Sequence, residues 1–194
     1  QGDVDTIQLT SGTNTVIGSV GADSITAGSG TNTVLGDDGE ATFKGGRLEL
    51  IRSTNSDQGA DDQITLEDGT NTVVAGDGQD MVAIGAGTNI VLGDEGSLRV
   101  NGDGTTTIQT INTSAGDKDT ITIGDGYNVV LGGAASDTIT VTGMATNSQG
   151  IVLGDNGTLT LAVDGSLASI ASSDYDQGDV DTIQLTSGTN TVIG

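Results

Sequence analysis

The sequence predicts an all-β protein, a parallel β-solenoid (β-roll or β-helix) of 18-residue coils with three inserted β-hairpins. Three observations favour this class. Ile, Val and Leu recur at fixed intervals, glycine-bearing turns separate short alternating runs, and the chain repeats itself along its whole length. Periodic self-similarity of this kind indicates a stack of supersecondary units, each of which buries its apolar face against its neighbours.

The repeat is defined by an aspartate that heads a D-x-[IV] triplet. These aspartates are Asp5, Asp23, Asp62, Asp80, Asp119, Asp137 and Asp181. Their spacing alternates between 18 residues and 39 residues, the last step being 44. Residues 1–194 therefore form one continuous solenoid segment with sub-repeats at about 1–57, 58–114 and 115–176. Residues 177–194 repeat residues 1–18 without a difference, which indicates a tandem array of 176-residue units.

Each 18-residue coil consists of two nonamers, one carrying Asp and the other carrying Asn. The runs that follow the aspartates, such as DTIQL and DSITA, alternate polar and apolar residues with the period of a half-buried strand. We expect one inward-pointing residue per coil on this side: Ile7, Ile25, Ile64, Val82, Ile121 and Ile139. Their counterparts on the Asn side are Val16, Val34, Val73, Val91, Val130 and Val152.

The 39-residue and 44-residue steps contain segments that are too long for plain coils. Each segment has two alternating runs around a turn that contains glycine, which is the signature of a β-hairpin. The sequence predicts hairpins at about 40–52, 97–111 and 158–170.

A second series of aliphatic residues directly follows the inward valines. It consists of Ile17, Leu35, Val74, Leu92, Leu131 and Leu153. A straight strand would turn these side chains outward and leave a large apolar patch. Three arrangements would bury them: apolar residues of the hairpins (Phe43, Leu98, Val100, Leu159 and Leu161), a neighbouring chain, or a corner that turns them inward.

The strongly negative charge restricts the classes of molecule that this chain can bind. The chain has 27 acidic and five basic residues and a formal net charge of −22. Such a chain repels nucleic acid and anionic membrane surfaces, and it has no apolar run long enough to insert into a membrane. The absence of Cys and His removes thiol chemistry, the commonest general base and the usual ligands of zinc and copper. Carboxylate and carbonyl oxygens, which calcium prefers, are abundant.

The nonamers resemble a known repeat family. GSVGADSIT (18–26) and AGDGQDMVA (75–83) are similar to the calcium-binding G-G-x-G-x-D-x-U-x nonapeptide of RTX proteins, each with one departure from the motif. The resemblance covers about two thirds of the chain. It implies that the first six residues of a nonamer form a turn and the last three a strand, and that calcium ions bind between successive turns. Every second nonamer departs by carrying Asn in place of Asp.

The aspartates of the turns are the candidate calcium ligands. Stacking coils places them along one edge at intervals of about 4.8 Å, where carboxylates repel one another and Lys118 is the one basic residue nearby. Calcium would cancel this repulsion, and turn carbonyls would complete its six to eight ligands. The alternative is a capping role in which each carboxylate bonds its own turn. The predicted metal ligands are Asp3, Asp5, Asp23, Asp62, Asp77, Asp80, Asp117, Asp119 and Asp137.

The other edge carries amides. Stacked asparagines can bond one another from coil to coil without an ion. We therefore expect a structural asparagine ladder of Asn14, Asn32, Asn71, Asn89 and Asn128. The G-D-x-G turns that open the hairpins (Asp37, Asp94 and Asp155) are explained by turn formation, with a second class of ion site as the alternative.

The sequence favours a structural role over an enzymatic one. Near-identical repeats present no unique constellation of catalytic groups. The chain resembles the extender regions of giant secreted bacterial adhesins and surface filaments, which implies an extracellular or cell-surface location. The implied partners are calcium ions, further copies of the 176-residue repeat and lateral neighbours of the same kind. A glycan-binding or ice-binding module is the alternative, the latter because T-x-T rows flank the asparagines; a calcium-dependent polysaccharide lyase or epimerase module is less favoured.

Overall fold

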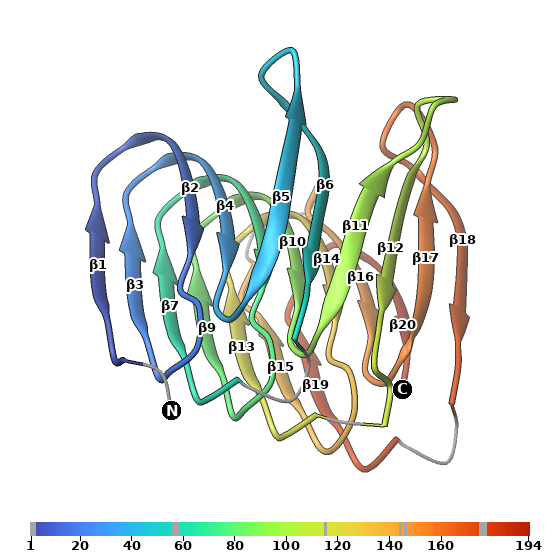
Figure 1. The fold of residues 1–194 in the computed structure, drawn as a ribbon. Coiled ribbons are helices and arrows are strands. Elements are labelled where there is room, and N and C mark those ends of the chain that lie inside the picture. The colour runs from blue at the N-terminus through green and yellow to red at the C-terminus, as the bar shows by residue number, and fades with distance from the viewer. Residues whose placement is uncertain (1–2, 56–58, 115, 144, 146, 175–177) are drawn as a thin grey trace.

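The computed structural model describes residues 3–55, 59–114, 116–143, 145, 147–174 and 178–194. All regular elements there are β-strands, arranged as three layers (Figure 1). The all-β solenoid class with three hairpins is thereby confirmed. The described residues contain no helix that is long and apolar enough to cross a membrane.

Two parallel sheets form the solenoid. Sheet A has seven strands in the order β1-β3-β7-β9-β13-β15-β19, and sheet B has seven in the order β2-β4-β8-β10-β14-β16-β20. The strands of sheet A are β1 (Thr6–Leu9), β3 (Ser24–Ala27), β7 (Gln63–Leu66), β9 (Met81–Ile84), β13 (Thr120–Ile123), β15 (Thr138–Val141) and β19 (Thr182–Leu185). The strands of sheet B are β2 (Gly12–Ile17), β4 (Gly30–Leu35), β8 (Gly69–Val74), β10 (Gly87–Leu92), β14 (Gly126–Leu131), β16 (Gln149–Leu153) and β20 (Thr189–Ile193).

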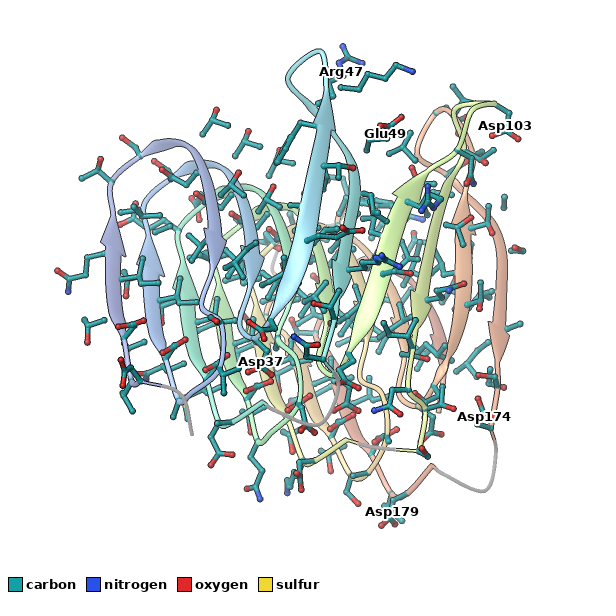
Figure 2. The ribbon with its side chains drawn as sticks, in the orientation of Figure 1. Asp37, Arg47, Glu49, Asp103, Asp174 and Asp179 are labelled. Carbon is teal, nitrogen blue, oxygen red and sulfur yellow. The ribbon has the colours of Figure 1, made fainter. Side chains whose placement is uncertain are left out.

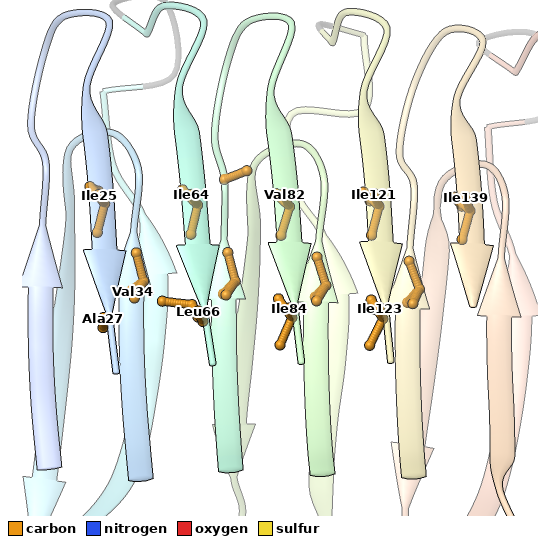
Figure 3. Packing of buried hydrophobic residues seen from close by; sticks show 14 of the residues in the cluster. Ile25, Ala27, Val34, Ile64, Leu66, Val82, Ile84, Ile121, Ile123 and Ile139 are labelled. Atoms are coloured by element: carbon orange, nitrogen blue, oxygen red, sulfur yellow. The ribbon is translucent and has the colours of Figure 1, made fainter. Parts of the chain in front are cut away.

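Equivalent residues of successive coils stack directly on one another. Ile7 pairs with Ile25 in sheet A, and Asn14 pairs with Asn32 in sheet B. The inward row Ile25, Ile64, Val82, Ile121 and Ile139 crosses sheet A (Figure 3) and packs with the valines of sheet B. Most of these side chains are inaccessible to solvent, so the thin core contains stacked aliphatic groups of matching shape.

The two halves of a coil are not alike. The coil passes from sheet A to sheet B over two residues, as at 10–11 and 28–29, whereas the return runs through six residues, as at 18–23 and 75–80. The expectation that both nonamers have a six-residue turn is therefore wrong for the Asn nonamer. The tight corner depends on glycine: Gly30 has a positive φ of 142°, and a Cβ atom there would overlap the carbonyl group of Gly12.

The three hairpins combine into a third layer. Sheet C is antiparallel and has six strands in the order β18-β17-β12-β11-β6-β5. Its strands are β5 (Gly39–Lys44), β6 (Arg47–Ser53), β11 (Gly96–Val100), β12 (Thr106–Thr110), β17 (Gly157–Leu161) and β18 (Leu167–Ser172). Each hairpin leaves the solenoid in one of the return turns and folds back over sheet B (Figure 1).

Sheet C covers the second aliphatic series. Leu35, Val74, Leu92, Leu131 and Leu153 are buried in one cluster with residues of the hairpins. Ile17, at the end of the stack, remains 42% exposed. Of the three arrangements open to the sequence, cover by the hairpins is the one observed.

The prediction that Phe43 takes part in this cover is wrong. Phe43 is 44% exposed, because it follows an irregularity in the β5–β6 register near the hairpin tip, which projects past sheet B (Figure 1). Ile51 and Ile108 contribute instead, together with the predicted Leu98, Leu159 and Leu161.

Candidate metal site

The return turns bring a row of aspartates to one edge of the solenoid. We call Asp23, Asp62, Asp80, Asp119, Asp137 and Asp181 the carboxylate row. Each one stands directly before a strand of sheet A, so the parallel stacking of the strands aligns the carboxylates coil by coil. All of them are buried except Asp181, in the last coil, which is half-buried.

One oxygen of each carboxylate in the row has a partner in the preceding coil. The backbone N–H of Asp5 donates to Oδ1 of Asp23, and this bond repeats along the whole stack at 2.7–2.9 Å. The capping role weighed for these aspartates is therefore real for Oδ1, but the capped amide belongs to the neighbouring coil. Each bond ties one coil to the next.

The other oxygen has no hydrogen-bond partner. Oδ2 of every member of the carboxylate row is buried and unpaired. A buried carboxylate oxygen without a donor or a cation is energetically costly. Since this oxygen recurs along the row, every coil has a buried carboxylate oxygen that needs a proton or a cation.

Carbonyl oxygens face the unpaired atoms. Most return turns open with a glycine, which brings no side chain to this position: Gly18, Gly36, Gly93, Gly132 and Gly154, with Ala75 in the turn 75–80. A Cβ atom built on Gly93 would overlap both Oδ2 of Asp119 and the carbonyl oxygen of Gly132 in the next coil. Gly36 has the same relation to Oδ2 of Asp62 and the carbonyl oxygen of Ala75. A carboxylate oxygen and a carbonyl oxygen of the same coil thus converge beside the glycine of the preceding coil, where only an Hα atom stands.

The pKa values reflect this environment. Burial, together with a smaller effect of neighbouring aspartates, raises the pKa of Asp62 to about 8, that of Asp80 to about 9 and that of Asp119 to about 10. Burial also raises the pKa of Asp137 to about 7, where the positive charge of Lys118 acts in the opposite direction. Each carboxylate must therefore bind a proton or a cation to be stable in the folded chain.

A second set of aspartates lies at the hairpin roots. We call Asp37, Asp94 and Asp155 the hairpin-root aspartates; Asp37 lies at the base of β5 (Figure 2). Oδ2 of Asp37 accepts the backbone N–H of Asp77 at 2.7 Å, and Oδ2 of Asp94 accepts that of Ala134 at 2.5 Å. Oδ1 of all three is buried and unpaired.

The hairpin-root aspartates act on the carboxylate row. Burial raises the pKa of Asp37 to about 7 and that of Asp94 to about 8. Asp37 in turn raises the pKa values of Asp62 and Asp80, as Asp94 does for Asp119. The hairpin-root aspartates are therefore part of the same electrostatic site, and their signal in the sequence is the G-D-x-G that opens each hairpin.

The other predicted ligands lie at the margin of the site. Asp3 and Asp5 are exposed at the first coil, where only the backbone of Asp5 joins the row. Asp117 is exposed and Asp77 is half-buried, and both contribute backbone N–H groups to hairpin-root aspartates. Asp181 belongs to the row although it was not among the predicted ligands.

The asparagines behave differently. Nδ2 of Asn14 donates to Oδ1 of Asn32 at 2.8 Å, and the same bond continues through Asn71 and Asn89 to Asn128. Each Nδ2 also donates to the carbonyl oxygen four residues earlier, at 2.9–3.2 Å. The series ends at Asn128, because Gly150 occupies the equivalent position in the next coil. Both amide atoms are thus satisfied without an ion.

The donor set of the carboxylate edge fits calcium. It consists of buried carboxylate and carbonyl oxygens, and the chain contains no His or Cys. No three acidic side chains within the described ranges converge closely enough to hold an ion alone. Carbonyl oxygens must therefore complete the coordination, as the convergence at Gly36 and Gly93 allows.

Comparison with known proteins agrees with this geometry. The family model for the RTX calcium-binding nonapeptide repeat (4 copies) matches residues 9–42, 58–82 and 67–97. No curated protein and no solved structure matches the chain. The matched segments contain Asp23, Asp62, Asp80 and two of the hairpin-root aspartates. RTX nonapeptide repeats bind calcium, so calcium is the cofactor of this chain.

Proposed function

We propose that this chain, which is built on RTX-type calcium-binding nonapeptide repeats, is a structural extender segment of a giant tandem-repeat extracellular protein that serves adhesion or forms a surface filament. One observation carries the proposal. The seventh coil, whose sequence copies the first, stacks on the sixth in the parallel register used throughout the repeat: Ile183 pairs with Ile139 as Ile25 pairs with Ile7. This register supports the proposal that a further repeat stacks in the same way.

Calcium would stiffen the rod at the carboxylate edge. Oδ2 atoms of the carboxylate row and carbonyl oxygens at the end of the same coil would hold the ions, and the hairpin-root aspartates Asp37, Asp94 and Asp155 would add negative charge beside them. A bound ion would neutralise the stacked carboxylates. The chain itself aligns the ligands, since the Oδ1 bonds fix each carboxylate against the preceding coil.

Folding would then depend on the compartment. At low calcium the unpaired carboxylates and the net charge of −22 oppose compaction. At the millimolar calcium of extracellular fluids, the free energy of binding becomes free energy of folding, and it increases with the ratio of free calcium to Kd. A chain that leaves the cell unfolded would become a rod outside.

The test is the length of tandem arrays. At about 4.8 Å per coil, each 176-residue unit should add roughly 29 Å to the rod. Arrays of one, two and four units, measured by small-angle X-ray scattering in millimolar calcium, should lengthen linearly and lose this dimension in EDTA. Compact particles, or rods whose length is unaffected by EDTA, would contradict the proposal.

The outer face of sheet A favours a second candidate function, ice binding. No residue of the seven strands of sheet A is charged, although the protein is strongly acidic, and its exposed positions include Thr26, Thr65 and Thr122. The T-x-T rows beside the asparagines do not offer such a face, because sheet C buries Thr33 and Thr72. A thermal-hysteresis assay tests the candidate: Thr65→Lys should abolish any activity, whereas Thr42→Lys on sheet C should not.

A further inference from the structure

Sheet C has two open edges, and these edges match each other. β5 is the outermost strand at one end and β18 at the other, whereas neighbouring hairpins are already joined through β6–β11 and β12–β17 (Figure 1). Both of these junctions are antiparallel and join the second strand of one hairpin to the first strand of the next. A third junction of this kind would join β18 to a following β5.

The spacing of the hairpins is constant along the solenoid. The hairpins leave the stack after Gly36, Gly93 and Gly154, and two coils separate each root from the next. In a tandem array, residues 177–194 supply the first coil of the following repeat, and residues 19–35 of that repeat supply the second. The next β5 would therefore stand at the same distance from β18 as β11 stands from β6.

The existing junctions also define the register. Arg52 pairs with Glu40 of its own hairpin and with Ser97 of the next one. Gln109 pairs in the same way with Ser97 and with Thr158. Ala171 pairs with Thr158, and its other side is open. The residue equivalent to Ser97 and Thr158 in a following repeat is Glu40, four residues after the root glycine.

The apolar row on the inner face of sheet C points to the same partner. It consists of Ala41, Ile51, Leu98, Ile108, Leu159 and Ile170. The four central members are 0–3% exposed, whereas Ala41 and Ile170, at the two ends, are only partly buried. An Ile170–Ala41 pair would close the row against sheet B and remove two free strand edges.

We propose that β18 of one 176-residue unit pairs antiparallel with β5 of the next, with Ala171 opposite Glu40 and Ile170 opposite Ala41, so that sheet C continues unbroken along the array. The proposal rests on the tandem arrangement of the proposed function. It makes the outer sheet a second continuous connection between units, in addition to the stacked coils.

The experiment uses a two-unit chain, residues 1–176 followed by residues 1–194. The test pair is Ala171→Cys in the first unit with Glu40→Cys in the second; the chain has no other cysteine. Directly opposed residues lie within disulfide reach, and diagonal ones lie at its limit. Mild oxidation should therefore cross-link this pair about 10-fold faster than Ser169→Cys with the same Glu40→Cys, a pair displaced by two residues on the same face.

The reference pair is Arg52→Cys with Ser97→Cys, which occupies the equivalent position inside one unit. If this pair cross-links while the Ala171–Glu40 pair is no faster than the displaced pair, the edge pairing is overturned. If the reference pair also fails, sheet C is not formed and the proposal falls with it. Scattering on the same two-unit chain separates the two proposals: an extended, EDTA-sensitive rod without the cross-link contradicts the edge pairing alone.

Discussion

Two rows of short polar side chains run along the same solenoid. They differ in whether their buried polar atoms have hydrogen-bond partners. Inside the asparagine ladder, at Asn32, Asn71 and Asn89, each Oδ1 accepts the amide of the preceding coil and each Nδ2 has two acceptors. In the carboxylate row, Oδ1 accepts a backbone N–H and Oδ2 has no partner. The asparagine row is complete, and the aspartate row is not.

The difference follows from the chemistry of the two side chains. An amide is both donor and acceptor, so identical copies can bond one another indefinitely. An ionised carboxylate only accepts, and a stack of copies requires an external positive charge. The same architecture thus provides one edge that is stable without an ion and one edge whose stability depends on calcium.

The largest expected effect is the response of the chelated protein to pH. The pKa values of Asp62, Asp80 and Asp119 are raised to about 8, 9 and 10 from an ordinary 3.8, so the folded state binds protons more tightly than the unfolded state. Their contribution to stability is full below about pH 4 and is lost as pH rises through 8 to 10. Each group changes the free energy of unfolding by up to about 1.4 kcal/mol per pH unit.

Urea unfolding in EDTA between pH 5 and pH 9 measures this dependence. Calcium competes with the protons, so its affinity should rise over the same range. Stability in EDTA that stays constant or increases with pH would show that the folded chain does not retain these protons, and it would contradict the raised pKa values of the carboxylate row.

A smaller but still large loss of stability is expected when an asparagine of the ladder is replaced by aspartate. In Asn89→Asp, the donations to Gly85 and Asn128 are lost, and a buried charge is created that keeps only the donation from Asn71. We expect a loss of about 3–5 kcal/mol in the free energy of unfolding. The matched control is Asn14→Asp in the half-exposed first coil, which should be mild. A variant that calcium restores to wild-type stability would contradict the distinction between the two edges.

The reverse change should have a smaller effect whose sign depends on calcium. In Asp119→Asn, the new Nδ2 would face the carbonyl oxygen of Gly132 and could donate to it. In EDTA this should stabilise the protein by about 1–3 kcal/mol, whereas in calcium the variant should be less stable than wild type. Melting curves in both conditions measure the two signs, with the exposed Asp5→Asn as control. Equal shifts in EDTA and calcium would contradict a metal-binding role for Asp119.

Periodicity made much of this arrangement predictable. An 18-residue step that preserves the Asp and Asn positions requires both rows, and the alternation around Ile25 and Val34 identifies the inner core. Periodicity does not predict that one oxygen of each carboxylate is hydrogen-bonded and the other unpaired, because this depends on which coil supplies the backbone N–H. The same holds for the tight corners of the Asn nonamers, where a side-chain amide replaces part of the turn.

The hairpins show a similar limit. Their positions follow from local alternation, but the pairing of β6 with β11 joins segments that the sequence separates by two coils. The burial of Ile51 and the exposure of Phe43 depend on where sheet C ends relative to sheet B. The hairpin-root aspartates were recognisable as turn residues, but their place beside the carboxylate row required the fold.

The central claim is that calcium completes the carboxylate row and is absent from the asparagine ladder. A crystal structure of the chain grown in calcium, with an anomalous difference map, tests it most directly. We predict peaks beside the Oδ2 atoms of Asp62, Asp119 and Asp137, where carbonyl oxygens lie close to them, and no peak beside Asn71 or Asn89. An empty carboxylate row in a folded chain, or ions along the asparagine ladder, would contradict the account.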